Sequence, residues 1–140
     1  MKIRFKKLDP KAVMPRKAHP TDAGFDLCCV TDYNIEPQER ALIDTGVAMD
    51  IPLGYCGLVT GRSGNTIKRG LVGQLGIIDS DYRGTVGIMA FNMSKETISI
   101  RAGERVGQIL IIPHLSADFE EAESLTETDR GVGGYGSSGR

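Results

Sequence analysis

Glycine spacing is the feature that most limits what this chain can fold into. Eighteen of the 140 residues are glycine, nearly twice the usual share of about 7 %. They do not recur at every third position, as collagen requires, but fall between short apolar stretches. Short apolar stretches separated by turn-forming residues indicate many β-strands joined by tight turns, in a single domain of ordinary size.

The expected strands follow one another at short intervals, and prolines fall between them or at their ends. They cover residues 3–5, 25–30, 41–51, 55–60, 71–78, 86–92, 97–100 and 106–112. One short helix is expected, with Ser63 as its cap and Gly70 as its left-handed end. The chain is therefore predicted to be all-β, as a sandwich or a barrel with at most one short helix.

Charge and composition exclude several classes of protein. Seventeen basic residues nearly balance 18 acidic ones, which argues against a protein that holds nucleic acid chiefly by charge. The longest aliphatic run, 109–112, is far short of the roughly 20 residues of a membrane span, and the basic N-terminus lacks the apolar stretch of a secretion signal. Two of the three cysteines, Cys28 and Cys29, are adjacent, which suits neither a disulfide nor a zinc site. We expect reduced thiols in a cytoplasmic protein with no membrane or nucleic-acid partner.

Two segments carry groups suited to a phosphorylated, planar ligand. Residues 61–64 (Gly-Arg-Ser-Gly) precede the expected helix, where free N–H groups, a guanidinium and a hydroxyl can bind phosphate; the alternative is an exposed turn. Residues 76–87 place Asp79 and Tyr82 in a loop between two glycines, Gly76 and Gly87, whose bare backbone a planar ligand can approach. The alternative is an ordinary hairpin loop, in which Asp, Ser and Gly are common.

Two polar residues stand inside otherwise apolar strands. Asp26 is unusual in a strand, and a buried partner, a hydrated cation or bonds to turn amides would each explain it. Gln108 either needs a hydrogen-bond partner or faces outward.

The C-terminal end differs from the rest of the chain. Residues 118–129 contain six acidic residues and no basic one, and their weak periodicity does not decide between helix and strand. Residues 130–140 contain five glycines, an arginine at each end and Tyr135 between them. This segment is either a disordered end or a flexible tail that wraps a polyphosphate and stacks on a base. We accordingly divide the chain into a β-barrel domain (1–128) and a flexible glycine-rich C-terminal tail (129–140).

Together these segments resemble the five ordered motifs of the trimeric dUTPases, the deoxyuridine triphosphate nucleotidohydrolases. The motifs correspond here to residues 18–27, 61–64, 76–84, 103–108 and the glycine-rich tail. The chain departs from the family pattern at few positions, none of which removes a functional group. They are Asp22 for a small residue, Asn65-Thr66 for Leu-Ala, Gly107 for Ala and Tyr135 for Phe.

The resemblance implies a distorted jelly-roll-like barrel, a homotrimer with active sites shared between chains, and Mg²⁺-dependent cleavage of dUTP to dUMP and pyrophosphate. In the reaction that the resemblance implies, Asp79 would activate the attacking water and Tyr82 would exclude a ribose 2′-hydroxyl. Gly76 and Gly87 would present backbone groups to uracil, and Asp26 would meet Mg²⁺ through water. The residues that would hold phosphate are Arg62, Ser63, Gly64 and Gln108. Those that would close over the ligand are Arg130, Tyr135, Gly136, Ser137 and Ser138.

Two other functions fit parts of the sequence. The related dCTP deaminases share the implied fold, but they need a general acid/base at the pyrimidine, usually Glu, and residues 76–87 contain none. A nucleotide-gated binding protein would use ordering of the tail to regulate a partner. Pyrophosphate release from dUTP discriminates between these alternatives.

Overall fold

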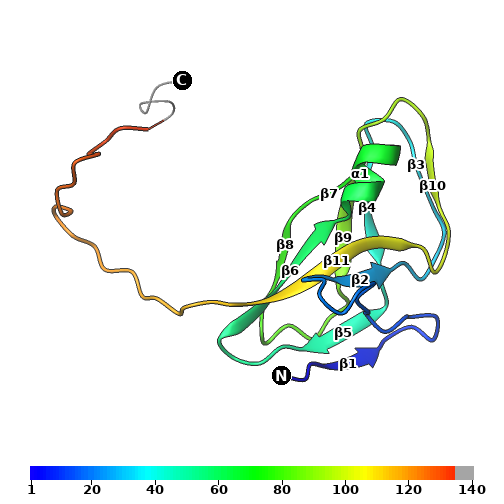
Figure 1. The fold of residues 1–140 in the computed structure, drawn as a ribbon, viewed down its shortest axis with the longest axis horizontal. Coiled ribbons are helices and arrows are strands. Elements are labelled where there is room, and N and C mark those ends of the chain that lie inside the picture. Colours follow the sequence, from blue (N-terminus) through cyan, green and yellow to red (C-terminus); the bar gives the residue numbers. More distant parts are fainter. Residues whose placement is uncertain (135–140) are drawn as a thin grey trace.

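The computed structural model describes residues 1–134, and its regular elements are eleven short strands and one helix (Figure 1). The strands are β1 (Arg4–Lys7), β2 (Phe25–Cys28), β3 (Tyr33–Ile35), β4 (Arg40–Asp44), β5 (Val47–Asp50), β6 (Tyr55–Gly61), β7 (Leu71–Gly73), β8 (Gly76–Ile78), β9 (Gly87–Asn92), β10 (Ile98–Ile100) and β11 (Arg105–Pro113). The helix is α1 (Ser63–Arg69). In the part of the chain described, no helix is long and apolar enough to cross a membrane.

All strand pairs are antiparallel, and they form four small sheets around one core. The largest sheet has the order β2-β11-β6-β8, the next is β4-β9-β7, and the pairs β1-β5 and β10-β3 complete the barrel. The predicted all-β fold with one short helix is confirmed. Strand β10 shows the predicted alternation, since Ile98 and Ile100 are buried and Ser99 is exposed.

Two expected strands are each divided in two because the chain passes from one sheet to another. The expected strand 41–51 breaks at Gly46, whose φ of 63° takes the chain from the β4-β9-β7 sheet to the β1-β5 pair. The expected strand 71–78 breaks after Gly73, so that β7 pairs with β9 and β8 pairs with β6. Strands that change sheet at a bend make the corners of such barrels.

The short helix begins and ends close to where it was predicted, but its cap is different. Arg62, in an extended conformation, is the N-cap residue, and no side chain caps the helix. The expectation that Ser63 caps it is therefore wrong, because Ser63 is already the first helical residue. Gly70 ends the helix in the left-handed conformation, with φ of 71°, as predicted.

The last strand leads into a long segment that lies away from the barrel. Figure 1 shows the chain after β11 running outward from the other strands. The N–H of His114 still bonds to the carbonyl of Gly54, but residues 115–132 are all exposed. Residues 114–128, which the predicted division assigns to the barrel domain, thus add no strand to the barrel in this single chain.

Candidate active site

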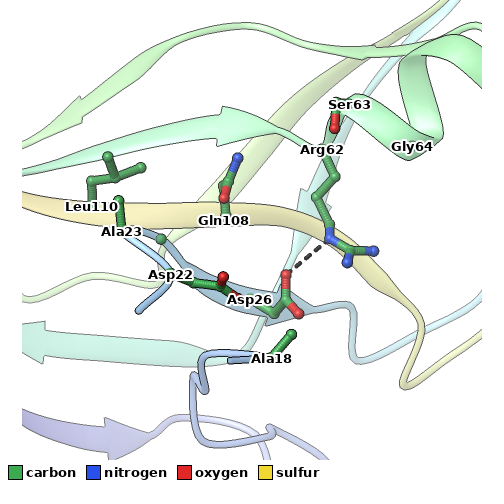
Figure 2. Close-up of a pocket in the computed structure, with 10 residues that line it drawn as sticks. Ala18, Asp22, Ala23, Asp26, Arg62, Ser63, Gly64, Gln108 and Leu110 are labelled. Atoms are coloured by element: carbon green, nitrogen blue, oxygen red, sulfur yellow. Dashed lines mark ion pairs between the residues drawn. The ribbon is translucent and has the colours of Figure 1, made fainter. Parts of the chain in front are cut away.

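A polar pocket of about 390 Å³ brings together three of the sequence motifs (Figure 2). Its lining residues come from the 18–26 segment, from the turn into α1 and from β11. They are Ala18, Asp22, Ala23, Gly24, Asp26, Arg62, Ser63, Gly64, Gln108 and Leu110. The structure therefore gathers in one pocket all four residues expected to hold phosphate, together with Asp26.

Two arginines bind the Asp26 carboxylate. Its Oδ1 lies 2.9 Å from Nε of Arg62, the ion pair drawn in Figure 2, and its Oδ2 lies 3.2 Å from a terminal nitrogen of Arg105. The side chain of Asp26 is only 16 % exposed, so partners of opposite charge are needed to stabilise it in the strand. Of the explanations open for Asp26, the structure supports an ionic partner, although both arginines are partly exposed rather than buried, with side chains 29 % and 54 % accessible. Because two guanidinium groups share one carboxylate, this cluster carries a net positive charge on the edge of the pocket.

Arg105 is the residue that the sequence analysis missed. It was part of a motif but was assigned no role, since nothing in the sequence shows which residue lies beside it. In the structure it stands on β11 opposite Cys28 of β2, which brings its guanidinium within reach of Asp26. Cys28 itself is half-buried next to this cluster, and burial raises the pKa of its thiol.

Gln108 lies across the bare backbone of Gly24. Its Nε2 donates to the carbonyl of Gly61, at 3.2 Å, so Gln108 is hydrogen-bonded as well as facing the pocket. A Cβ at position 24 would overlap the Gln108 carboxamide oxygen and lie 3.0 Å from its Cδ. Gly24 thus allows Gln108 to approach this closely, and it is not held in an unusual backbone conformation.

Three residues that depart from the family pattern make hydrogen bonds that stabilise the segments around the pocket. Asn65 donates from Nδ2 to the carbonyl of Arg105 at 3.1 Å, which ties α1 to β11. Thr66 bonds from its hydroxyl to the carbonyls of Arg62 and Leu71. Asp22 accepts the N–H of His19 at 2.8 Å and closes the turn before β2; this bond lowers the pKa of its carboxyl.

At Gly107, a glycine in place of the family's alanine, a Cβ would lie 2.8 Å from Cδ1 of Ile88 and 2.9 Å from the carbonyl oxygen of Thr60. The core is filled at that point, which explains why this chain has no side chain there.

The loop that carries Asp79 and Tyr82 is separate from this pocket. It joins β8 to β9, which pair with other strands and not with each other, so the alternative of an ordinary hairpin loop is wrong. None of its residues lines the pocket. Asp79 is exposed, and Tyr82 folds back over Gly84 and donates from its hydroxyl to the carbonyl of Thr85 at 3.1 Å. The structure thus groups the expected site residues into two sets within one chain.

Gly76 and Gly87, the two glycines on either side of this loop, have different surroundings. At Gly76 the nearest atom to an added Cβ would be Cβ of Val59, at 3.9 Å, so the strand offers free space there. At Gly87 the corresponding space holds Leu42, whose Cδ1 would be 2.8 Å away. A side chain at position 87 would therefore have to displace the exposed Leu42 side chain.

The expected tail residues lie mostly outside the described part of the chain. Arg130 is exposed and donates from Nε to the carbonyl of Gly133 at 2.8 Å. Tyr135, Gly136, Ser137 and Ser138 fall outside the residues that the structure describes.

Comparison with known proteins connects these two sets of residues to one family. The family model for dUTPase matches residues 10–139. The deoxyuridine 5′-triphosphate nucleotidohydrolase of Rhodococcus erythropolis is 45 % identical, over 99 % of this chain and 87 % of its own length.

Solved structures agree with the sequence comparison. A mutant of the Staphylococcus bacteriophage 80alpha dUTPase with dUpNHpp has a TM-score of 0.92 and 34 % identity, and the match covers 99 % of each chain. A mutant dUTPase from phage phi11 of S. aureus, described for its coordination of a structural Mg(II) ion, has a TM-score of 0.83 and 32 % identity, over 89 % of this chain and 98 % of its own. The resemblance inferred from the five motifs is confirmed. This chain therefore belongs to the dUTPase family, the enzymes that hydrolyse dUTP.

Proposed function

We propose that the enzyme converts dUTP to dUMP and pyrophosphate by directing water at the α-phosphate, in an active site that two or more chains complete. The observation that carries the proposal is the separation of its parts. The pocket contains the phosphate-binding candidates, while Asp79 and Tyr82 lie on the loop between β8 and β9, which contributes nothing to it. Hydrolysis needs both sets of groups at one ligand, and the same loop of a second chain would supply the missing set.

The pocket is suited to the triphosphate. Arg62 and Arg105 exceed the charge of Asp26, and a planar guanidinium can bind phosphate oxygens in pairs. Ser63 and Gly64 form the first turn of α1, whose N–H groups have no acceptor within the helix. The Gln108 carboxamide completes this set. Catalysis of phosphoryl transfer depends chiefly on positioning and charge, so such a set is adequate without a covalent intermediate.

The loop between β8 and β9 is suited to binding the nucleoside and the attacking water. Asp79 would accept a proton from the attacking water, and the ring of Tyr82 would pack against deoxyribose and leave no room for a 2′-hydroxyl. Backbone groups of Gly76 and Gly87 would read the uracil edge. Cytosine reverses donor and acceptor at that edge and would leave buried groups unpaired.

We propose a homotrimer as the assembly that joins the two sets. Support comes from the segment after Pro113, which runs away from its own barrel. Three large apolar side chains in it, Leu115, Phe119 and Leu125, are therefore almost fully exposed. Large apolar side chains held in water favour burial against another chain. In this assembly residues 129–140 would act as the closing tail, with Arg130, Tyr135, Gly136, Ser137 and Ser138 over the ligand of a neighbouring barrel.

Mg²⁺ is the proposed cofactor, and it would neutralise charge on the triphosphate when bound. Within residues 1–134, no three His, Cys, Asp or Glu side chains gather as a metal site. That fits an ion that arrives chelated by the substrate and needs few protein ligands. Both oxygens of Asp26 are engaged by arginines, so this carboxylate would contact the ion only through water.

In the cell the reaction would keep uracil out of DNA and supply dUMP for thymidylate synthesis. We place the enzyme in the cytoplasm, which fits three cysteines that are all free, with Cys29 and Cys56 buried.

A mixing experiment tests the shared site. Two inactive proteins are made: full-length Asp79→Asn, and a chain truncated after Thr128 that retains Asp79. Each is expected to lose at least about 10²-fold in kcat, and the Asn variant should still bind dUTP. The two are unfolded together, refolded and assayed for pyrophosphate release, with each protein refolded alone as the control.

If Asp79 and the tail come from different chains, about one quarter of the sites in a random mixture hold both, and activity returns. If the tail closes over the Asp79 loop of its own chain, no site holds both Asp79 and a tail, and the mixture stays as inactive as the two parent proteins. No recovery in mixtures whose mixed trimers are confirmed by mass would refute the shared site and leave dUTP hydrolysis intact.

A further inference from the structure

The loop that carries Asp79 and Tyr82 is held to the barrel by very little. Strand β8 ends at Ile78 and β9 begins at Gly87, so residues 79–86 pair with no strand. The second half of this loop is well anchored: the N–H of Val86 bonds to the carbonyl of Val47 at 2.7 Å, and the Thr85 hydroxyl bonds to Asp44 at 2.6 Å. The tip, residues 79–83, has no such support from the backbone.

Arg83 is the side chain that fixes the tip. One terminal nitrogen of its guanidinium donates to the carbonyl of Ser80 at 2.7 Å and to its neighbour Tyr82 at 2.9 Å. The other donates to Oδ1 of Asp50, at the end of β5, at 2.8 Å. Within residues 1–134, this is the one side-chain hydrogen bond that links residues 79–83 to another strand. These bonds use two separate nitrogens of one rigid guanidinium, whereas a lysine carries all its donors on a single nitrogen.

Asp50 is placed to hold that guanidinium. It ends β5, and its second oxygen binds Arg4, the residue opposite it on β1. Its side chain is 31 % exposed, and those of Arg4 and Arg83 are 87 % and 56 % exposed, so both ion pairs lie at the surface. Each oxygen of the carboxylate has its own arginine, and Oδ1 is the one that binds Arg83.

We propose that Asp50, acting through Arg83, is a positioning residue for Asp79 and Tyr82, and so supports both the rate and the preference for deoxyribose over ribose. This inference rests on the roles proposed above for Asp79 and Tyr82. Half-exposed ion pairs contribute little to folding stability. A displacement of about 1 Å in a reacting group can lower a rate by about 10²-fold. Loss of the pair should therefore affect turnover far more than folding.

A double-mutant cycle with a matched control tests the proposal. The variants are Asp50→Ala, Arg83→Ala and the two together, and Arg4→Ala is the control, because it removes the other partner of the same carboxylate and does not touch the loop. For each, kcat and KM are measured with dUTP and with UTP, with the melting temperature and hydrogen exchange of the 79–86 amides. Asp50→Asn, which keeps the size of the side chain, replaces Asp50→Ala if that protein does not fold.

We expect Asp50→Ala and Arg83→Ala each to lower kcat/KM for dUTP by about 10-fold, to narrow the ratio of dUTP to UTP and to speed exchange in 79–86. The double variant should be no slower than Arg83→Ala alone, because Asp50 acts through Arg83. Arg4→Ala should stay within about twofold of the wild type in every kinetic constant.

Three results would overturn the proposal. The first is kinetic constants in Asp50→Ala that match those of Arg4→Ala. The second is a double variant whose loss is the product of the single losses, because Asp50 then acts independently of Arg83. The third is a lower melting temperature with an unchanged ratio of dUTP to UTP, which is a structural role only. Failure of the roles proposed for Asp79 and Tyr82 is recognised separately, by full activity in Asp79→Asn or an unchanged sugar preference in Tyr82→Ala.

Discussion

Replacing Gly24 by alanine should displace the Gln108 carboxamide without removing any polar group from the pocket. An added Cβ would overlap the Gln108 carboxamide oxygen and lie 3.0 Å from Cδ and 3.3 Å from Cβ of the same side chain. The φ of Gly24 is not in the left-handed region, so the backbone tolerates alanine and the effect falls on Gln108. That side chain must rotate away, because its own Cβ is fixed by strand β11.

The size of the effect follows from what Gln108 loses. Its bond to the carbonyl of Gly61 contributes about 0.5–1.5 kcal/mol, and an off-rotamer side chain costs about 0.5–1.5 kcal/mol more. Together these amount to about 1–3 kcal/mol, divided between folding and ligand binding. Since 1.4 kcal/mol corresponds to about tenfold in affinity, we expect kcat/KM for dUTP to fall by about 5- to 30-fold.

The assay is steady-state pyrophosphate release, with thermal unfolding measured alongside. Gln108→Ala and the double variant complete a cycle: once the carboxamide is gone, alanine at position 24 meets far less of the side chain, so the double variant should match Gln108→Ala. Wild-type kcat/KM in Gly24→Ala would refute the reasoning. So would a double variant whose loss is the product of the two single losses.

Three further predictions concern other parts of the chain. Gly64→Ala adds a Cβ that meets no protein atom within 4 Å, so it should stabilise α1 by up to about 1 kcal/mol in thermal unfolding while raising KM for dUTP, because the new methyl group stands in the pocket. A lower stability, or an unchanged KM, would contradict it. The N–H of Ala102 and then Arg101 hold the pKa of Asp32 below its ordinary value of 3.8, so the stability that Asp32 provides is present above that pH and is lost as pH falls through the lowered pKa. Urea unfolding of Asp32→Ala should show a deficit at neutral pH that disappears in acid, and a deficit independent of pH would be the opposite result. The chain has no Trp, so Tyr135→Trp adds a single fluorophore whose emission should change when a non-hydrolysable dUTP analogue and Mg²⁺ bind; a flat titration with binding confirmed by calorimetry would show that the tail does not cover the base.

Local pattern was sufficient to predict those parts of the fold that local forces decide. The alternation at Ile98 and Ile100 predicted β10, and the spacing from Ser63 to Gly70 predicted the helix. Strand β3 was missed because three residues, two of them only partly buried or exposed, carry too little pattern. The breaks at Gly46 and after Gly73 were missed because apolar residues continue through them and only the choice of partner strand changes.

In the site, too, local sequence pattern predicted some features, and others depend on residues that are distant in the chain. The segments that hold its groups were visible in the sequence, since glycines, hydroxyls and charges cluster there. Their pairings were not, because the Arg62–Asp26 and Arg83–Asp50 ion pairs join residues far apart in the chain. For the same reason no residue pattern could indicate that Arg105 shares Asp26, or that Leu42 fills the space beside Gly87.

The close packing at Gly107 restricts the order in which this sequence can change. An alanine there, the usual residue of the family, would need room from both Ile88 and the backbone at Thr60. We therefore expect Gly107→Ala to destabilise the fold on its own, and to cost less stability once Ile88 is shortened to valine. The effect of a residue at position 107 thus depends on the residue at position 88, so consensus engineering of this enzyme should change the two positions together.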